Sequence, residues 1–151
     1  MTKTSSTDYE KTVGVAAHPG ALFNALTTTD GLTAWWTTAE GDGDTGGVLR
    51  FLFDAGPCVM HVDRAAQPVV QWTVTECDFL PDWVGTRPTF TIADAGHDGS
   101  ELRFRHHGLT SDLECIDECS RGWDHFIESL RAYAESGAGM PRGSGEDNAR
   151  R

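Results

Sequence analysis

The chain has 151 residues and carries 12 Lys and Arg against 23 Asp and Glu, a formal net charge of −11. Negative charge of this size repels phosphate backbones and anionic lipid head groups, so we expect no nucleic-acid partner and no membrane partner. The chain has no apolar run of about eighteen residues, so no membrane span is predicted. Its length fits one domain that buries roughly two thirds of its unfolded surface.

The two ends differ in composition from the middle of the chain. Residues 1–8 are polar and lack the apolar core of a signal peptide, so we expect a disordered tail and a cytoplasmic location. Residues 138–151 are rich in glycine and charge and are predicted to be a second disordered tail. The domain is thus predicted to span residues 9–137. Four cysteines are too few for a disulfide scaffold, so reduced thiols are expected.

The first third of the chain predicts one strand and two short helices. Residues 9–17 alternate as a strand does and end at His18, Pro19 and Gly20. Short helices are expected at 21–26 and 31–36, the second capped by Thr29 or Asp30. Residues 40–47 are predicted to be a loop. Their carboxylates lack the downstream acidic residue of a calcium-binding loop, so we expect no metal there.

Five further segments alternate with period two and predict strands at 48–53, 58–63, 69–76, 87–93 and 100–107. Short loops join them, so the fold class expected is α+β with a six-stranded antiparallel sheet. One parity of these strands is apolar and forms the inner face. Cys58 belongs to that inner set and Cys77 to the outer set, which disfavours a disulfide between them. Glu76 shares the inner parity. Its carboxylate is expected either to reach the opening of a cavity on the inner face or to lie in solvent at the end of the strand.

Residues 114–136 predict one long helix that covers the inner face. Its apolar residues recur every three or four positions, from Ile116 to Tyr133. Ser111 and Glu114 have capping-box spacing, and Gly137 provides the stop. Gly122 costs helix stability, so we expect another part of the protein to approach the backbone there. A single helix about 10 Å across cannot fill a curled six-stranded sheet, which predicts a ligand-sized space at one end.

The chain also carries a set of residues whose order resembles that of a known family. They are Val15, His18, Pro19, Leu22, Phe23, Ala25, Leu26, Trp35, Trp36, Gly46, Gly47, Val62, Asp63, Trp72, Leu102, Phe104, His106, Gly108, Leu109, Gly122, Trp123, Leu130 and Tyr133. In this order they resemble the activator-of-heat-shock-protein-90-ATPase family of the START/birch-pollen-allergen (SRPBCC) superfamily. The resemblance covers about residues 9–140 and extends to Gly137, Gly139 and Pro141.

The resemblance implies a helix-grip fold, in which an antiparallel sheet grips a long C-terminal helix around a hydrophobic cavity. Members of the superfamily bind lipids, sterols or polyketides, some catalyse cyclisation, and some assist the 90-kilodalton heat-shock protein in the stress response. The family offers no universal catalytic motif to transfer. The chain lacks the separate N-terminal domain of the eukaryotic co-chaperones, so we expect no chaperone partner.

The predicted ligand cavity is lined by aromatic and apolar residues of the sheet and the long helix. They are Trp35, Trp36, Phe51, Phe53, Met60, Trp72, Trp83, Phe90, Phe104, His106, Cys119, Trp123 and Phe126. We expect Trp83 at the entrance and Trp35 or Trp36 at the opposite lip. Cys115 and Cys119 lie one helical turn apart, but their spacing is unlike a zinc knuckle, and no metal or other cofactor is expected.

His106 is the candidate catalytic residue, because its parity points it into the apolar face. It is either a core histidine bonded to its neighbours or an acid or base that acts on a ligand. Three hypotheses follow: binding of a small hydrophobic or aromatic molecule without turnover, a polyketide-cyclase-like or dehydratase-like enzyme, and a chaperone-activator-like interaction module. We expect the first, a non-catalytic ligand-binding protein. Whether an edge strand pairs two copies into a homodimer is left open.

Overall fold

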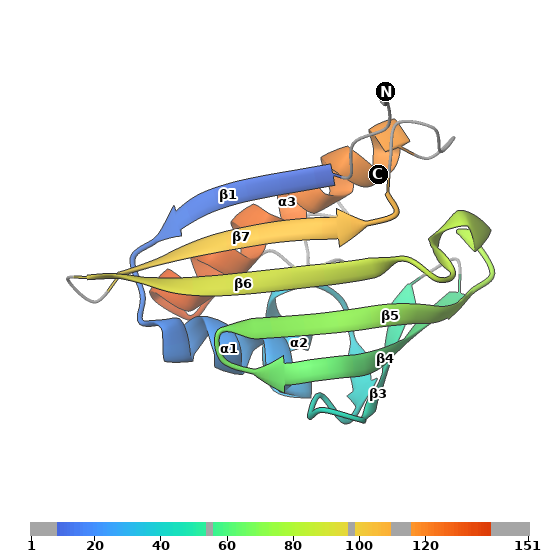
Figure 1. Ribbon diagram of the computed structural model, residues 1–151, viewed down its shortest axis with the longest axis horizontal. Coiled ribbons are helices and arrows are strands. Elements are labelled where there is room, and N and C mark those ends of the chain that lie inside the picture. Colours follow the sequence, from blue (N-terminus) through green and yellow to red (C-terminus); the bar gives the residue numbers. More distant parts are fainter. Residues whose placement is uncertain (1–8, 54–55, 97–98, 110–115, 140–151) are drawn as a thin grey trace, which may run out of the picture.

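A computed structural model describes residues 9–53, 56–96, 99–109 and 116–139. Seven antiparallel strands form one sheet in the order β1-β7-β6-β5-β4-β3-β2, and a long helix lies across one face of it (Figure 1). This is the helix-grip α+β fold. The elements are β1 (Tyr9–Val15), α1 (Pro19–Thr27), α2 (Thr29–Trp35), β2 (Ala39–Gly41), β3 (Val48–Phe53), β4 (Gly56–Ala66), β5 (Val69–Cys77), the 3-10 turn η1 (Pro81–Trp83), β6 (Arg87–Gly96), β7 (Gly99–His107) and α3 (Ile116–Ser136).

The predicted elements are present within a few residues of their expected ends, and the sheet has one strand more than predicted. The additional strand is β2, which pairs with β3 through Ala39 and Phe51, within a stretch interpreted as loop. Three residues are too few to show an alternating pattern, so the sequence did not reveal it. The N-cap of α2 is Thr28, whose hydroxyl accepts from the Gly31 N–H at 3.0 Å, and neither Thr29 nor Asp30 takes that position.

A β-bulge changes the register between β4 and β5. Val59 pairs with Glu76 and Met60 pairs with Val74, so Thr75 is an extra residue on β5. Beyond the bulge the two faces exchange, which leaves Glu76 exposed and Cys77 buried. The prediction that Cys77 faces outward is wrong, because strict alternation does not survive an inserted residue.

The ladder between β5 and β6 is interrupted at Pro88. The N–H of Ile92 donates to the carbonyl of Pro68, so residues of even number on β6 turn their N–H toward β5. Pro88 has this parity and has no N–H to donate. The strands meet again where the N–H of Val74 donates to the Thr86 carbonyl at 2.9 Å. The interruption lies beside η1, at the end of the sheet where the candidate site is found.

The two short helices cover one end of the sheet and not the other (Figure 1). There α2 is joined to α1 and α3: the Trp35 indole N–H donates to the carbonyl of Ala25, and the Ser129 hydroxyl donates to the carbonyl of Trp35 at 2.6 Å. α3 ends as predicted at Gly137, where φ is +84° and the N–H bonds to Tyr133. The predicted capping box at Ser111 and Glu114, the predicted tail at 1–8, and residues 140–151 of the tail predicted at 138–151 lie outside the described residues.

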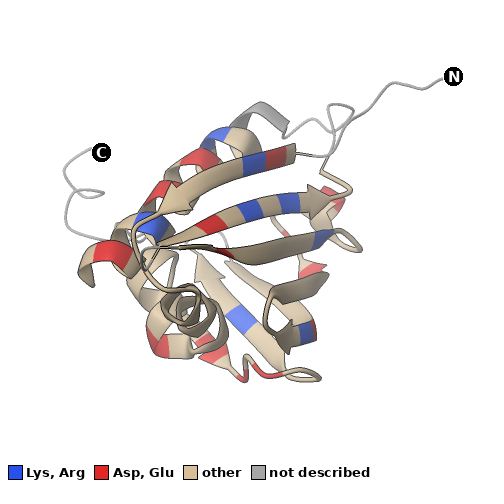
Figure 2. Cartoon of the chain, turned by 60° about the vertical axis from the view of Figure 1, so that its left-hand side comes forward, with Lys and Arg blue, Asp and Glu red and all other residues tan. Residues whose placement is uncertain are grey.

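Charged residues lie on the outside of the sheet and along the exposed face of α3 (Figure 2). The middle of α3 is held to β1 by Asp124, whose carboxylate accepts from the Tyr9 hydroxyl and lies 3.5 Å from the Lys11 ammonium. Among the described helices, none is long and apolar enough to cross a bilayer.

Candidate ligand-binding cavity

A cavity of about 220 Å³ lies between the N-terminal part of α3, the η1 segment and the neighbouring ends of β3 and β4. Its lining is almost entirely apolar. Buried residues form its inner wall, namely Trp36, Cys58, Trp83, Cys119 and Trp123, and half-buried residues form its rim, namely Phe53, Phe79, Leu80, Gly122 and Phe126. A lining of this composition would select a ligand by its shape and by its contacts with aromatic rings.

Gly122 on α3 borders the cavity and has no side chain to fill it. Apart from its neighbours on α3, none of the described residues comes within 4 Å of a Cβ built at Gly122. The expectation that something approaches the backbone at Gly122 is therefore wrong. The glycine leaves open space, and any larger side chain at this position would project into the cavity region.

Three tryptophans form the aromatic wall. The rings of Trp83 and Trp123 are stacked, with centroids 6.0 Å apart and planes 4° from parallel. Trp36 contacts Trp123 at 5.1 Å between centroids with an interplanar angle of 44°. The Trp83 indole N–H donates to the sulfur of Cys119 at 3.3 Å, which joins the η1 segment to α3. Trp83 is 7% exposed and belongs to the wall, whereas the neighbouring Phe79 and Leu80 lie at the rim.

His106 supports this wall from behind. Its side chain is fully buried, and it does not line the cavity. The Trp123 indole N–H donates to Nδ1 at 3.0 Å, so Nδ1 must be the unprotonated nitrogen. Nε2 then carries the proton and donates to the Thr86 hydroxyl at 2.8 Å, and that hydroxyl donates to the carbonyl of Trp83 at 2.5 Å. The neutral tautomer of His106 is thus set by geometry.

This network determines what His106 can do chemically. Both ring nitrogens are engaged by protein groups, and the rings of Trp83 and Trp123 are His106's neighbours on the cavity side, at 4.7 and 5.8 Å between centroids. A general acid or base must reach the reacting atom within hydrogen-bond distance. In this arrangement His106 orients the indole of Trp123 and fixes the η1 segment through Thr86, which is the role of a positioning residue.

Of the residues predicted to line a cavity, some do and others lie in the packed core beside it. Those that line it are Trp36, Phe53, Trp83, Cys119, Trp123 and Phe126. The remainder, Trp35, Phe51, Met60, Trp72, Phe90, Phe104 and His106, are buried among one another. Trp35 lies at the end of the sheet that α1 and α2 cover, and it does not line the cavity. The indole N–H of Trp72 finds no acceptor within the part of the chain that the structure describes.

Four lining residues were not in the predicted set: Cys58, Phe79, Leu80 and Gly122. Cys58 has the inward parity of its strand, and that signal could have identified it. Phe79 and Leu80 belong to an irregular loop, where periodicity gives no direction. Gly122 is a glycine in the middle of a helix, which is unfavourable for helix stability, and that signal could have identified it as a lining residue.

Among the described residues, no three His, Cys, Asp or Glu side chains are grouped as metal ligands would be. Cys115, the partner that the sequence suggested for Cys119, lies outside the described residues. Cys58, Cys77 and Cys119 are buried, and no disulfide joins Cys58 and Cys77.

Most of the chain matches the model of one known protein family. Residues 16–135 match the family model described as Activator of Hsp90 ATPase homolog 1-like protein. This range contains every residue that lines the cavity. No curated protein matches the sequence at a significant level.

Solved structures share the fold over nearly the whole chain. The solution structure of the Aha1 dimer from Colwellia psychrerythraea is 27% identical and superposes with a TM-score of 0.77, covering 88% of this chain and 99% of that one. An HSP90 activator from Plasmodium falciparum is 18% identical with a TM-score of 0.68, covering 82% of this chain and 92% of that one. At that identity the second likeness shows the fold alone.

Proposed function

Because this chain belongs to the Activator of Hsp90 ATPase homolog 1-like family, a branch of the SRPBCC helix-grip proteins, we propose that it binds a small, flat, largely apolar molecule in the cavity beside α3. The observation that carries the proposal is the cavity of about 220 Å³ walled by Trp36, Trp83 and Trp123. Three indoles contribute large, rigid contact area with defined ring orientations, so they favour an aromatic guest over a flexible chain.

The size of the cavity narrows the choice of ligand. An engineered apolar cavity of about 150 Å³ in another protein holds benzene, so about 220 Å³ accommodates one ring or two fused rings. The half-buried rim residues would contact any substituent that extends outward. A lipid acyl chain or a sterol exceeds this volume unless the rim moves.

Tryptophan fluorescence offers a direct test, because three of the chain's five tryptophans line the cavity. The purified chain is titrated with indole, 2-naphthol and naphthalene, and with palmitate as a long-chain comparison. We expect saturable quenching by the one- and two-ring compounds and weaker binding of palmitate. Absence of saturable binding across the aromatic panel would overturn the proposal.

The substitution Gly122→Leu separates binding in this cavity from binding elsewhere. A Cβ at Gly122 meets nothing within 4 Å, so the leucine can be accommodated by filling the open space. We expect at least about a tenfold loss of 2-naphthol affinity, which corresponds to roughly 1.4 kcal/mol. The control is Gly20→Ala on α1, a position also free of contacts and outside the cavity lining. Equal affinity of all three proteins would move the binding site away from the cavity.

Family membership favours a second candidate function, a module that binds a heat-shock-protein-90-type chaperone and raises its ATPase rate. The Colwellia relative is described as a dimer, so self-association of this chain is part of the same candidate. Adding the purified chain to such an ATPase tests the first element, and light scattering on a concentration series tests the second. An unchanged rate and a monomeric mass at every concentration would remove this candidate and leave ligand binding unaffected.

A further inference from the structure

Cys58 and Cys77 face each other across the inner face of the sheet. They are directly opposed on the antiparallel strands β4 and β5, one residue beyond the pairing of Val59 with Glu76. The bulge at Thr75 brings Cys77 onto the same face as Cys58. The two residues are 0% and 1% exposed, and their thiols are free and hydrogen-bonded to each other.

This thiol pair is connected to the cavity. Cys58 is one of the residues that line the cavity wall. Cys77 starts the turn in which the N–H of Leu80 donates to the Cys77 carbonyl at 3.1 Å, and that turn carries the rim residues Phe79 and Leu80. A small solute in the cavity therefore lies against the Cys58 side chain, and Cys77 is the residue directly opposite Cys58 on the neighbouring strand.

We propose that Cys58 and Cys77 are a redox-active dithiol in the cavity wall, which a hydroperoxide entering the cavity converts to a cross-strand disulfide. In the first step the thiolate of one of the two cysteines attacks one peroxide oxygen, the O–O bond breaks, and that cysteine becomes a sulfenic acid while hydroxide leaves and takes up a proton. In the second step the thiol of the other cysteine attacks the sulfenic acid sulfur, the S–O bond breaks, and water leaves. Two thiols lose two electrons in all, and one hydrogen peroxide is reduced to two waters.

The electrostatics of the pair give each cysteine its part. The hydrogen bond from Cys58 lowers the pKa of Cys77 against the opposing effect of burial, and a backbone hydrogen bond from Leu80 lowers it further. The same thiol contact, together with burial, raises the pKa of Cys58. The pKa shifts thus favour a thiolate at Cys77, whereas Cys58 is the thiol that lines the cavity.

The local backbone permits the bond. Directly opposed residues of an antiparallel pair have Cβ atoms about 4.5–5.5 Å apart, and a disulfide needs about 3.5–4.5 Å. The strands must close by roughly 1 Å, and the irregular pairing next to the cysteines is where a sheet yields most easily. Closure would shift the start of the turn that carries Phe79 and Leu80, so oxidation alters the cavity rim.

The test uses the full chain, reduced and freed of reductant, and treated with a graded series of hydrogen peroxide. Intact-mass spectrometry follows the loss of two hydrogen atoms, and peptide mapping without reduction locates the bond. We expect a peptide that links residues 58 and 77 in the wild type and in the double variant Cys115→Ser/Cys119→Ser, and no intramolecular bond to residue 58 in Cys77→Ser. Linkage elsewhere, or sulfinic acid at either cysteine without a 58–77 link, would overturn the proposal even if the variants fold poorly, because the wild type gives the map.

A second readout asks whether the bond acts on the cavity. Affinity for 2-naphthol is compared between the reduced and the oxidised wild type, with Cys77→Ser treated identically as the control. We expect a change of at least about threefold in the wild type alone. This coupling rests on the proposed function, whereas formation of the disulfide does not, so failure to bind 2-naphthol would leave the mapping result standing.

Discussion

The two halves of α3 follow one pattern of apolar residues but have different surroundings. In the C-terminal half, Ile127, Ser129 and Leu130 are completely buried. Just beyond the end of the helix, a Cβ at Gly139 would come within 2.7 Å of the Ala34 carbonyl oxygen. In the N-terminal half, Gly122 faces open space and Phe126 is half buried beside a cavity. The C-terminal half is thus enclosed by neighbouring elements, whereas the N-terminal half packs on the sheet through Trp123 and borders the cavity on one side.

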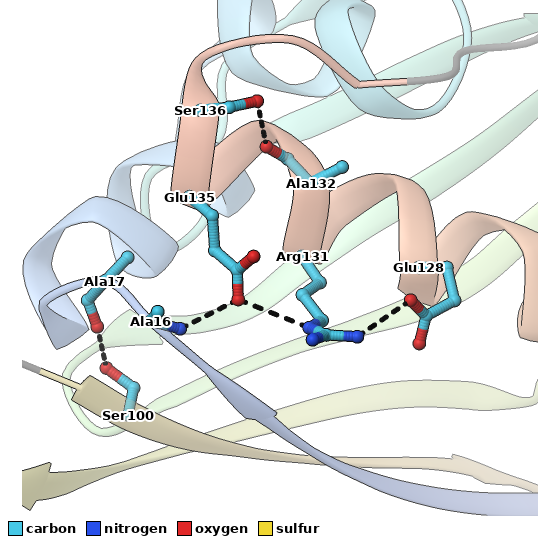
Figure 3. Close-up of polar contacts among 8 residues, drawn as sticks. All are labelled: Ala16, Ala17, Ser100, Glu128, Arg131, Ala132, Glu135 and Ser136. Atoms are coloured by element: carbon cyan, nitrogen blue, oxygen red, sulfur yellow. Dashed lines mark hydrogen bonds and ion pairs between the residues drawn. The ribbon is translucent and has the colours of Figure 1, made fainter.

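Polar contacts reinforce the packed half at the corner between β1 and α1 (Figure 3). Glu135 accepts from the backbone N–H of Ala16 at 2.8 Å and from Arg131 at 3.2 Å, and Arg131 also donates to Glu128. Nearby, the Ser100 hydroxyl donates to the carbonyl of Ala17 at 2.6 Å. These bonds attach the last turns of α3 to a backbone segment that is far away in the sequence. The candidate site lies at the other end of α3, away from these contacts.

The largest difference should appear between Leu130→Ala and Phe126→Ala, which lie about one turn apart. Leu130 is completely buried, so its truncation should lower the free energy of unfolding by about 2–5 kcal/mol. Phe126 is larger but half buried, so its truncation should cost about 1 kcal/mol, and it should weaken 2-naphthol binding instead. Urea denaturation measures both. Equal costs would mean that the two halves are packed alike.

Removing the support behind the cavity wall should have the next largest effect. His106→Leu keeps most of the volume but leaves the Trp123 indole N–H without its acceptor, which should cost about 1–3 kcal/mol. The same substitution at the exposed His125 on α3 is the control and should change stability by no more than about 0.5 kcal/mol. If His106 acts on a ligand rather than on Trp123, stability will be nearly unchanged by its replacement.

Gly122→Ala should stabilise the protein by about 1 kcal/mol, because alanine is the better helix former and nothing within 4 Å opposes its Cβ. A substitution that improves stability while shrinking a cavity would show that the glycine is retained for the space it leaves. The midpoint of urea denaturation and the affinity for 2-naphthol are measured on the same samples. A loss of stability would indicate that the helix is closed over this position in solution.

The smallest effect concerns pH and the packed half. The backbone N–H of Ala16 and then Arg131 hold the pKa of Glu135 below its ordinary value. The stability it contributes is therefore present above about pH 4.3, the unfolded value, and is lost as the pH falls through the folded pKa. Glu135→Gln should lower the free energy of unfolding by less than about 1 kcal/mol at pH 7 and by nothing at pH 2. Glu128→Gln, which keeps the Ala16 contact of Glu135, is the control, and urea denaturation at the two pH values measures the difference.

The sequence predicted more of the fold than of the site. Spacings of three and four identified α3 and its stop at Gly137, and period-two alternation located six of the seven strands. Both signals arise from local geometry and a single buried face, which a chain displays without its partners. The lining of the cavity was recovered in part, because parity tells which side chains point inward but not which of them lack a neighbour. Phe79 and Leu80 were missed since an irregular loop has no period.

By itself, the sequence determined the helix-grip architecture, the absence of an apolar span, and an inner face rich in tryptophan and phenylalanine, since each depends on residue types at fixed spacings. Only the tertiary structure decided where the hollow lies, that Gly122 opens onto it, that His106 is held behind Trp83 and Trp123, and that Cys58 meets Cys77. These features depend on one inserted residue at Thr75, on Pro88, and on two short helices that reach only one end of the sheet. The position of a cavity depends on how elements that are distant in the sequence pack together, and a local sequence pattern carries no information about that packing.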